Sequence, residues 1–454
     1  MRIQEHLEAT DFSDDLERFW RISATKIRLL ESSWEGTGAP VMTAAGRYTS
    51  REWTEWTQGF QYGSPLLQFE ATGETEFLEM ARDKTVERMG PHLTHSGVHD
   101  HGFNNVSTYG TLLRLICETR IVASIWERRF YELALACSAA VQANRWTELG
   151  AGGFIYSFNG PHSLFADTMR TLRVLGIGHL LGHELRGEGD RRVSLLDRLI
   201  EHAVATLRYN VYYGEGRDIY DVRGRVAHES IFNSNDGSYR CPGTQQGYSP
   251  FSTWTRGLGW VICGCAEQLE FLDQLDEEHF PAEQPRDRVV ALLERAARAT
   301  CDFYIENSPT DGIPYWDTGA PGLERMNDPS SRPADPFDGH EPVDSSAAAI
   351  AAQGLLRLGH FLGRKEAGVR YWKAGLTVLQ TLLSDTYLCQ DDEHEGLILH
   401  SLYHRPRGWD DLPDGSVPSG ESTMWGDYHA REVCLYLQRI ASDQGPLYFW
   451  SVVT

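Results

Sequence analysis

Apolar residues recur at three- and four-residue spacing in about twelve stretches of this chain, which is the spacing of one helix face. The predicted helices cover residues 16–30, 63–70, 75–88, 110–121, 126–144, 164–185, 193–211, 255–272, 286–306, 345–362, 369–384 and 422–440. Alternating segments typical of strands are few and short, at 153–159 and 396–403. The pattern therefore predicts an all-α protein.

The helical stretches continue along the chain without a Pro-rich or low-complexity linker between them. About twelve helices, paired into six hairpins, can close into a toroid whose loops gather at one mouth. A helical solenoid is the alternative, but strong internal repeats are missing from the sequence. We predict a single (α/α)6-barrel domain over residues 1–454, with the N-terminal ~45 residues as its first helix and lead-in.

Composition narrows the choice of partner and compartment. The net charge is −22, whereas a nucleic-acid-binding protein needs a basic face, and the same charge disfavours anionic membrane surfaces. The 8 cysteines are scattered and form no pair of CxxC motifs, so we expect reduced thiols and no zinc site. The N-terminus has no apolar leader, and no run of about 18 apolar residues occurs. We therefore expect a cytoplasmic protein that binds neither nucleic acid nor membrane.

Two aspartates at predicted helix starts are candidates for acid–base chemistry. Asp100 lies in HDHGFNN, and Asp167 lies in SLFADTMRTLRVLGIGHLL. An aspartate at a helix start is usually an N-cap, and this interpretation applies to both. The residues after Asp167 are so apolar that its helix must be largely buried. A partly desolvated carboxylate has a raised pKa, which suits it to proton transfer, so both interpretations of Asp167 stay open.

A second group of candidates lies at a loop-to-helix junction, where Gln246, Trp254, Arg256 and Trp260 are close in sequence. One interpretation is an aromatic stacking surface beside a guanidinium that grips a carboxylate. The other is that Trp254 and Trp260 are core residues and Arg256 pairs with a structural acid. His228 in HESIFN and Trp56 in EWTEWTQGF have the same two options, a site role or a structural one.

Three predicted loops are long for connections in a compact domain. They cover residues 209–252, 307–343 and 403–420, and they are dense in Trp, Tyr, Asp, His and Arg. Long ordered loops are often functional, so we expect these loops to frame a binding site.

Seven segments, in this order and at this spacing, resemble the unsaturated glucuronyl hydrolases, glycoside hydrolase family 88. The combination is specific, although each segment alone would be weak. The segments are WTQGF at 56–60, HDHGF at 99–103, ADTM at 166–169, QGYSPFSTWTRGLGW at 246–260, PYWDTGAP at 314–321, DSSAAAIAAQGLL at 344–356 and MWGDYHAREV at 424–433.

This resemblance implies an (α/α)6 barrel that releases a 4,5-unsaturated uronic acid from the non-reducing end of lyase-generated oligosaccharides. It implies no metal and no cofactor. Asp167 matches the general acid and base, and Asp100 matches a second essential carboxylate that stays ionised and raises the pKa of Asp167. His228 matches an active-site histidine. The positions that resemble substrate contacts are Trp56, Gln246, Arg256, Trp260 and, by a looser alignment, Tyr387.

The chain also departs from the family pattern. Gln245 replaces a histidine, Thr171 replaces an asparagine, and Gln61 replaces a tryptophan; the stretches 212–227 and 326–342 look longer than usual. These departures leave open the sugar beyond the terminal uronate.

Three other functions are alternatives to an unsaturated glucuronyl hydrolase. They are an unsaturated rhamnogalacturonyl hydrolase, a conventional inverting uronidase on saturated substrates, and a non-catalytic sugar-binding protein. The chain is expected to be a monomer or a homodimer.

Overall fold

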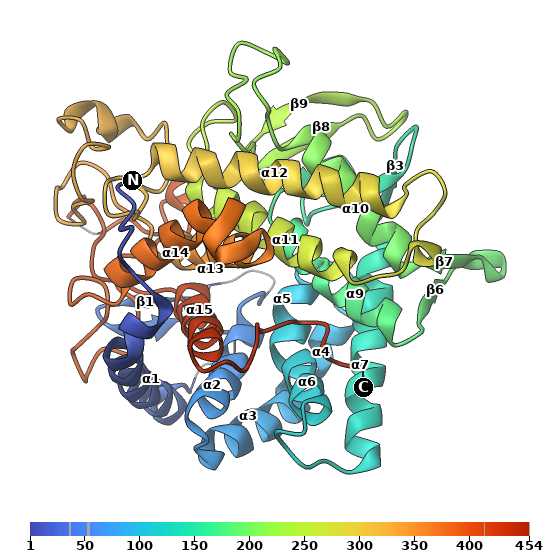
Figure 1. The fold of residues 1–454 in the computed structure, drawn as a ribbon, viewed down its shortest axis with the longest axis horizontal. Coiled ribbons are helices and arrows are strands. Elements are labelled where there is room, and N and C mark those ends of the chain that lie inside the picture. Colours follow the sequence, from blue (N-terminus) through green and yellow to red (C-terminus); the bar gives the residue numbers. More distant parts are fainter. Residues whose placement is uncertain (36–37, 52–54, 413, 454) are drawn as a thin grey trace.

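An inner ring of helices forms the centre of the computed structural model, which describes residues 1–35, 38–51, 55–412 and 414–453 (Figure 1). Each inner helix contacts the next, and the last contacts the first, so the ring is closed. In ring order its members are α2 (Gln58–Thr72), α5 (His101–Asn105) continued by the π-helix η2 (Val106–Gly110) and α6 (Thr111–Cys117), α8 (Thr168–Thr171) with α9 (Arg173–Leu180), α11 (Thr255–Asp273), α13 (Ser345–Phe361) and α15 (Met424–Ala441).

An outer layer of longer amphipathic helices surrounds this ring. Its members are α1 (Ser13–Ser33), α3 (Thr75–Arg88), α7 (Ile125–Asn144), α10 (Leu195–Tyr209), α12 (Arg286–Asn307) and α14 (Val369–Leu382). Inner and outer helices alternate along the chain, and each outer helix packs on an inner helix next to it in sequence. The predicted (α/α)6 barrel is therefore confirmed.

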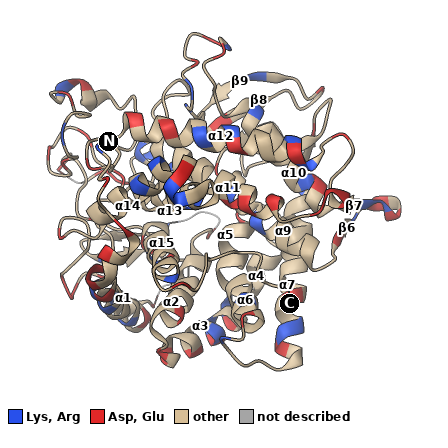
Figure 2. Ribbon diagram, viewed as in Figure 1, with Lys and Arg blue, Asp and Glu red and all other residues tan. Residues whose placement is uncertain are grey.

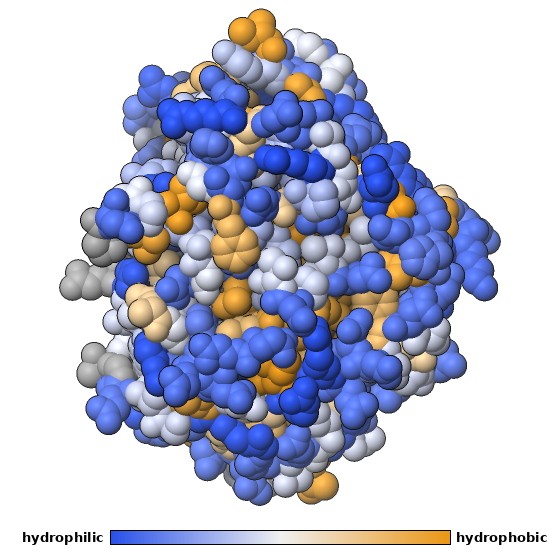
Figure 3. Space-filling model, turned by 90° about the vertical axis from the view of Figure 1, so that its left-hand side faces the viewer, coloured by the Kyte–Doolittle hydropathy of each residue, from blue (hydrophilic) through white to orange (hydrophobic). Residues whose placement is uncertain are grey.

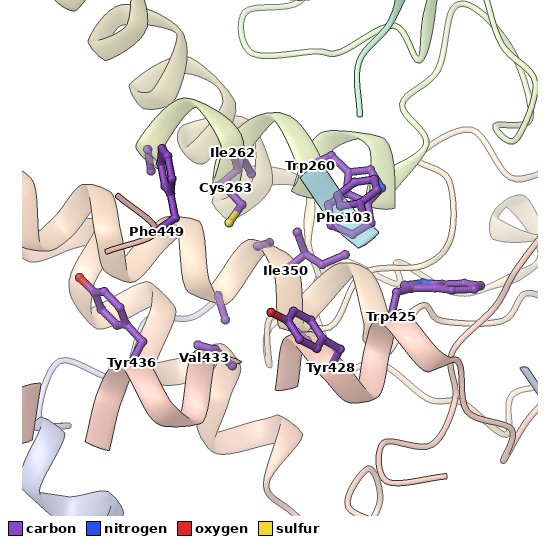
Figure 4. Packing of buried hydrophobic residues seen from close by; sticks show 14 of the residues in the cluster. Phe103, Trp260, Ile262, Cys263, Ile350, Trp425, Tyr428, Val433, Tyr436 and Phe449 are labelled. Carbon is purple, nitrogen blue, oxygen red and sulfur yellow. The ribbon is translucent and has the colours of Figure 1, made fainter. Parts of the chain in front are cut away.

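Small residues let the inner helices approach one another closely. Residues 345–359 of α13 are all buried, and they include five alanines between 347 and 352. A Cβ atom added to Gly354 would lie 2.7 Å from the backbone nitrogen of Cys263 on α11, so this contact requires glycine. Large side chains fill the remaining space, as where Phe103 packs on Trp260 with ring centroids 4.8 Å apart (Figure 4).

The shorter elements lie in the loops between these helices. The strands form two-stranded sheets, apart from one three-stranded antiparallel sheet in the order β5–β8–β9. The strands are β1 (Met42–Ala44), β2 (Arg47–Thr49), β3 (Trp146–Glu148), β4 (Gly153–Ile155), β5 (Ser163–Phe165), β6 (Glu184–Arg186), β7 (Arg192–Ser194), β8 (Glu229–Phe232) and β9 (Tyr239–Gly243); the short helices are η1 (Ala9–Phe12), α4 (Gly90–Leu93), η3 (Glu188–Asp190), η4 (Glu277–His279), η5 (Pro321–Arg325), η6 (Gly363–Ala367) and η7 (Arg405–Arg407).

Two local predictions are wrong, and tertiary contacts explain both. The predicted helix 164–185 begins as strand β5, because that segment pairs with β8 from a distant loop. The predicted strand 396–403 forms no ladder. The backbone N–H groups of Leu397 and Ile398 instead donate to the carboxylate of Asp427, at 2.8 and 2.9 Å.

Charged residues lie mainly on the outer layer, for example along α12 (Figure 2). The side of the molecule that carries the loops around residues 310–340 is covered mostly by hydrophilic residues (Figure 3). In the part of the chain that the structure describes, every helix is too short or too polar to cross a membrane.

Candidate active site

One cavity lies where the N-terminal ends of several inner helices meet the long loops. It contains the candidate carboxylates and is otherwise lined mainly by aromatic and amide side chains. The lining residues are Trp56, Asp100, Phe158, Asp167, Gln245, Gln246, Trp254, Arg256, Trp260, Tyr403, His404, Arg407 and Trp409.

The two carboxylates occupy N-cap positions without capping. Asp100 precedes α5 and Asp167 precedes α8, yet neither side chain accepts a hydrogen bond from its helix. His99 lies between them, with its Nε2 3.4 Å from Oδ2 of Asp167 and 3.9 Å from Oδ1 of Asp100. Among the described residues, Oδ1 of Asp167 has no hydrogen-bond partner although it is buried. The capping interpretation is therefore wrong for both, and an unpaired carboxylate oxygen remains for a ligand.

The electrostatics of this trio differ from the prediction. Burial raises the pKa of Asp100, and the negative charge of Asp167 adds to this effect. Burial would also raise the pKa of Asp167, but the net pKa is lowered, chiefly by the positive charge and the hydrogen bond of His99. The pKa of His99 is raised because the two carboxylates outweigh its burial. The prediction that an ionised Asp100 raises the pKa of Asp167 is thus wrong for the free protein, since His99 lies closer to Asp167 than to Asp100.

His228, just before β8, is held as a neutral hydrogen-bond donor. Its Nδ1 accepts the backbone N–H groups of Gln245 and Gln246, at 3.2 and 3.4 Å, so its proton resides on Nε2. Burial lowers the pKa of His228 to about 4, which keeps the ring uncharged at neutral pH. Its Nε2 is buried and has no partner among the described residues. The N–H group at Nε2 is therefore available to a ligand or to Asp167.

Arg256 lines the cavity, but its terminal nitrogens are engaged by the protein. Nη1 donates to Oδ2 of Asp344 and to the carbonyl of Leu402, both at 2.8 Å. Nη2 donates to Oε1 of Gln246 at 2.9 Å and to the carbonyl of Tyr403 at 2.6 Å. The interpretation that Arg256 pairs with a structural acid is correct. One consequence is that the amide oxygen of Gln246 is occupied, which leaves its NH2 group to donate.

Aromatic rings build the cavity walls. Trp56 stacks on Trp425, with centroids 4.8 Å apart and planes at 28°, and its Nε1 donates to the Tyr403 hydroxyl at 3.1 Å. Trp260 also lines the cavity but is almost fully buried. Tyr387 does not line the cavity; it packs against His400, with centroids 5.6 Å apart. Every predicted site residue except Tyr387 therefore lines the cavity or, as His228 does, contacts residues that line it.

Sequence reasoning missed several residues of this site. His99 stands next to Asp100 in the chain, and this adjacency was the available signal. The loop at 403–420 was predicted to frame a site, but its individual contributors were not named. The residues not predicted individually as site residues are His99, Phe158, Gln245, Tyr403, His404, Arg407 and Trp409.

His99, Asp100 and Asp167 also have the ligand types of a metal site. One nitrogen and two carboxylate oxygens of these residues lie within 4.8 Å of one another. A histidine with two carboxylates suits several divalent ions. The statement that the reaction uses no metal therefore stays a prediction.

Comparisons with known proteins agree with the fold and the motifs. No protein-family model matches the chain. The chain is 29% identical over 409 residues to the unsaturated glucuronyl hydrolase of Bacillus sp. (strain GL1), covering 88% of this chain and 90% of that protein. It is 26% identical over 384 residues to the unsaturated glucuronyl hydrolase of Formosa agariphila, covering 83% and 78%.

Solved structures show the same architecture. The crystal structure of the unsaturated glucuronyl hydrolase from Bacillus sp. GL1 matches with a TM-score of 0.69 at 23% identity, over 94% of this chain and 97% of that one. The likeness therefore covers nearly the full length of both proteins. By sequence and by fold, the chain resembles the unsaturated glucuronyl hydrolases, which are glycoside hydrolases, over most of its length.

Proposed function

We propose that this glycoside hydrolase releases a 4,5-unsaturated uronic acid from the non-reducing end of lyase-generated oligosaccharides. The observation that carries the proposal is the buried, unpaired Oδ1 of Asp167 in an aromatic-walled cavity that also holds Asp100. Such a group can exchange a proton with a carbon atom of a bound ring, because no protein donor competes for it.

The reaction we propose is hydration of the C4=C5 enol ether, with Asp167 as acid and then as base. Asp167 donates its proton to C4, and the electrons of the double bond form the new C4–H bond. Positive charge then develops at C5 and the ring oxygen. A water molecule bonds to C5 while the Asp167 carboxylate removes one of its protons. The resulting hemiketal opens by breaking the bond between C5 and the ring oxygen, and the hemiacetal left at C1 expels the aglycone as an alcohol.

His99 and Asp100 act in this proposal as the proton store for Asp167. In the free protein the pKa values of His99 and Asp100 are raised and that of Asp167 is lowered, so His99 and Asp100 hold a proton more readily than Asp167 does. A bound uronate brings its own negative charge, which raises the pKa of any carboxyl group facing it. The proton on His99 Nε2 then has a short path, 3.4 Å, to Asp167.

Two neutral donors are suited to the polar groups of the sugar, and the tryptophans to its faces. Arg256 holds the amide oxygen of Gln246 and backbone N–H groups hold Nδ1 of His228, so these side chains offer a sugar their NH2 group and their Nε2–H group as donors. Trp56 and Trp409 offer flat apolar surfaces at the cavity wall.

The names of the relatives point to different parent polysaccharides. Three curated relatives are unsaturated chondroitin disaccharide hydrolases of streptococci, and one solved structure is described as specific for heparin. An unsaturated sugar is what these names have in common, and the terminal unsaturated uronate is the sugar that the proposed reaction acts on. We therefore propose it as the recognised part of the substrate.

The substitution Asp167→Asn tests the proposed acid. We expect it to abolish the loss of enol-ether absorbance on unsaturated disaccharides while the far-UV circular dichroism spectrum stays unchanged. Asp385→Asn is the matched control, because this carboxylate is 78% exposed and lies outside the cavity. Full activity in Asp167→Asn would contradict the assignment.

A substrate screen separates the alternatives. The enzyme is assayed on unsaturated disaccharides from chondroitin, hyaluronan, heparin, ulvan, gellan and pectin lyases, and on saturated uronides. We expect activity on one or more unsaturated substrates. A preference for the rhamnose-linked product would favour the rhamnogalacturonyl alternative, and cleavage of saturated uronides alone would favour a conventional inverting uronidase.

A further inference from the structure

The solvent-facing side of α7 carries several exposed apolar residues beside the exposed Arg129, which distinguishes it from other helices of the outer layer. Trp126 is 82% exposed and Val122, just before the helix, is 93% exposed. By contrast, the outward positions of α12 include Arg288 and Arg295. The exposed apolar residues of this α7 surface are Val122, Ile125, Trp126, Phe130 and Leu133, with Val86 from α3.

These residues form a seam of the kind that pairs two helices. Trp126, Phe130, Leu133 and Cys137 follow one another at intervals of 4, 3 and 4 residues, which is the spacing of helix-pairing positions. The opposite face of α7 is buried in the barrel, so the helix cannot rotate to bury these four residues. From residue 133 to residue 144 the helix has no charged residue. The seam is therefore fixed at the surface.

The area of the α7 surface matches that of a protein–protein interface. From their exposed fractions, its six residues present on the order of 800 Å² to solvent, about what each partner buries in a standard stable interface. The largest exposed apolar patch on a typical monomer is about 300–600 Å². The α7 surface thus exceeds what a soluble monomer ordinarily leaves uncovered.

The charges around the seam are already paired within the chain. Glu127 pairs with Arg82 of α3 at 2.7 Å, and Glu132 pairs with Arg128 at 3.0 Å and Arg129 at 2.6 Å. A partner that covers the seam therefore needs to supply no charge of its own. The surface that fits it best is itself apolar and uncharged, and the seam on α7 of a second copy of this chain has these properties.

We propose that α7 forms a dimer interface with a second copy of this chain, the two helices packing antiparallel across a twofold axis. A twofold interface uses the same surface on both subunits, so the surface must complement itself. In this register Phe130 faces Leu133 of the partner subunit, and Trp126 faces Cys137 of the partner subunit. None of these residues lines the active-site cavity, so the proposal stands independently of the proposed function.

Sedimentation velocity from about 1 to 100 μM tests the proposal, because mass action makes a dimer depend on concentration. We expect the wild type to reach twice the chain mass of 51.3 kDa, and Trp126→Glu with Leu133→Glu to stay at one chain mass. Ile219→Glu is the matched control and should remain dimeric, since Ile219 is 91% exposed on a different loop.

Retained folding and glycosidase activity show that the double variant is intact. Leu133→Arg alone serves as a second variant if the double variant does not fold. A wild type that sediments as one chain over the whole range would overturn the proposal, as would a double variant that dimerises as tightly as the wild type.

Discussion

Asp344→Asn tests how much the buried pair with Arg256 stabilises the barrel and its cavity wall. Oδ2 of Asp344 accepts a hydrogen bond from Nη1 of Arg256 at 2.8 Å, and Oδ1 caps α13 by accepting from the backbone of Ser346 at 3.1 Å. Both side chains of the pair are at most 1% exposed. Asparagine keeps an oxygen for the cap but places an NH2 group against the guanidinium, so the charge partner is lost while the shape is preserved.

The magnitude follows from burial. Removing one partner of a buried ion pair leaves an uncompensated charge and costs about 3–5 kcal/mol of unfolding free energy. Asp344→Ala also removes the cap, which adds about 1 kcal/mol. Urea unfolding followed by tryptophan fluorescence measures both changes. Because Arg256 also holds the amide of Gln246, we expect KM for an unsaturated disaccharide to rise in both variants.

Asp385→Asn is the control for this experiment, since Asp385 pairs with Arg18 at a similar distance of 2.7 Å but is 78% exposed. An exposed pair contributes at most about 1 kcal/mol. Equal losses in Asp344→Asn and Asp385→Asn would refute the argument that burial decides the strength of these pairs.

His99→Asn should reduce the free energy of unfolding most between pH 3.8, the ordinary pKa of an aspartate, and pH 6.5, that of a histidine. In this range the attraction between His99 and Asp167 is complete. The attraction is lost as the pH falls through the lowered pKa of Asp167 or rises through the raised pKa of His99. Urea unfolding at several pH values measures it, and a pH-independent difference would contradict the assignment. Gly102→Ala should lower the free energy of unfolding by about 2–3 kcal/mol, because a Cβ there would lie 2.1 Å from the carbonyl oxygen of Thr171. Gly90→Ala, whose Cβ meets nothing within 4 Å, should change it by less than about 1 kcal/mol, and equal effects would refute this view of the α5–α8 contact.

The sequence by itself determined the helical architecture and most of the site. Apolar spacing along the chain predicts amphipathic helices, because helix periodicity is a local property. The ordered motifs identified Asp100, Asp167, His228, Gln246 and Arg256, and all five lie in or against the cavity. Asp100, Asp167 and Arg256 lie at helix starts, so their position follows once the ring of helices closes.

Only the tertiary structure decided how these groups act on one another. The lowered pKa of Asp167 depends on His99, whose Nε2 is 3.4 Å away across 68 positions of sequence. The engagement of Arg256 depends on Asp344 and on carbonyl groups of the loop at 402–403. Charge interactions and hydrogen bonds act over a few ångströms, so they follow the distances that folding creates between remote segments, and sequence spacing does not specify those distances.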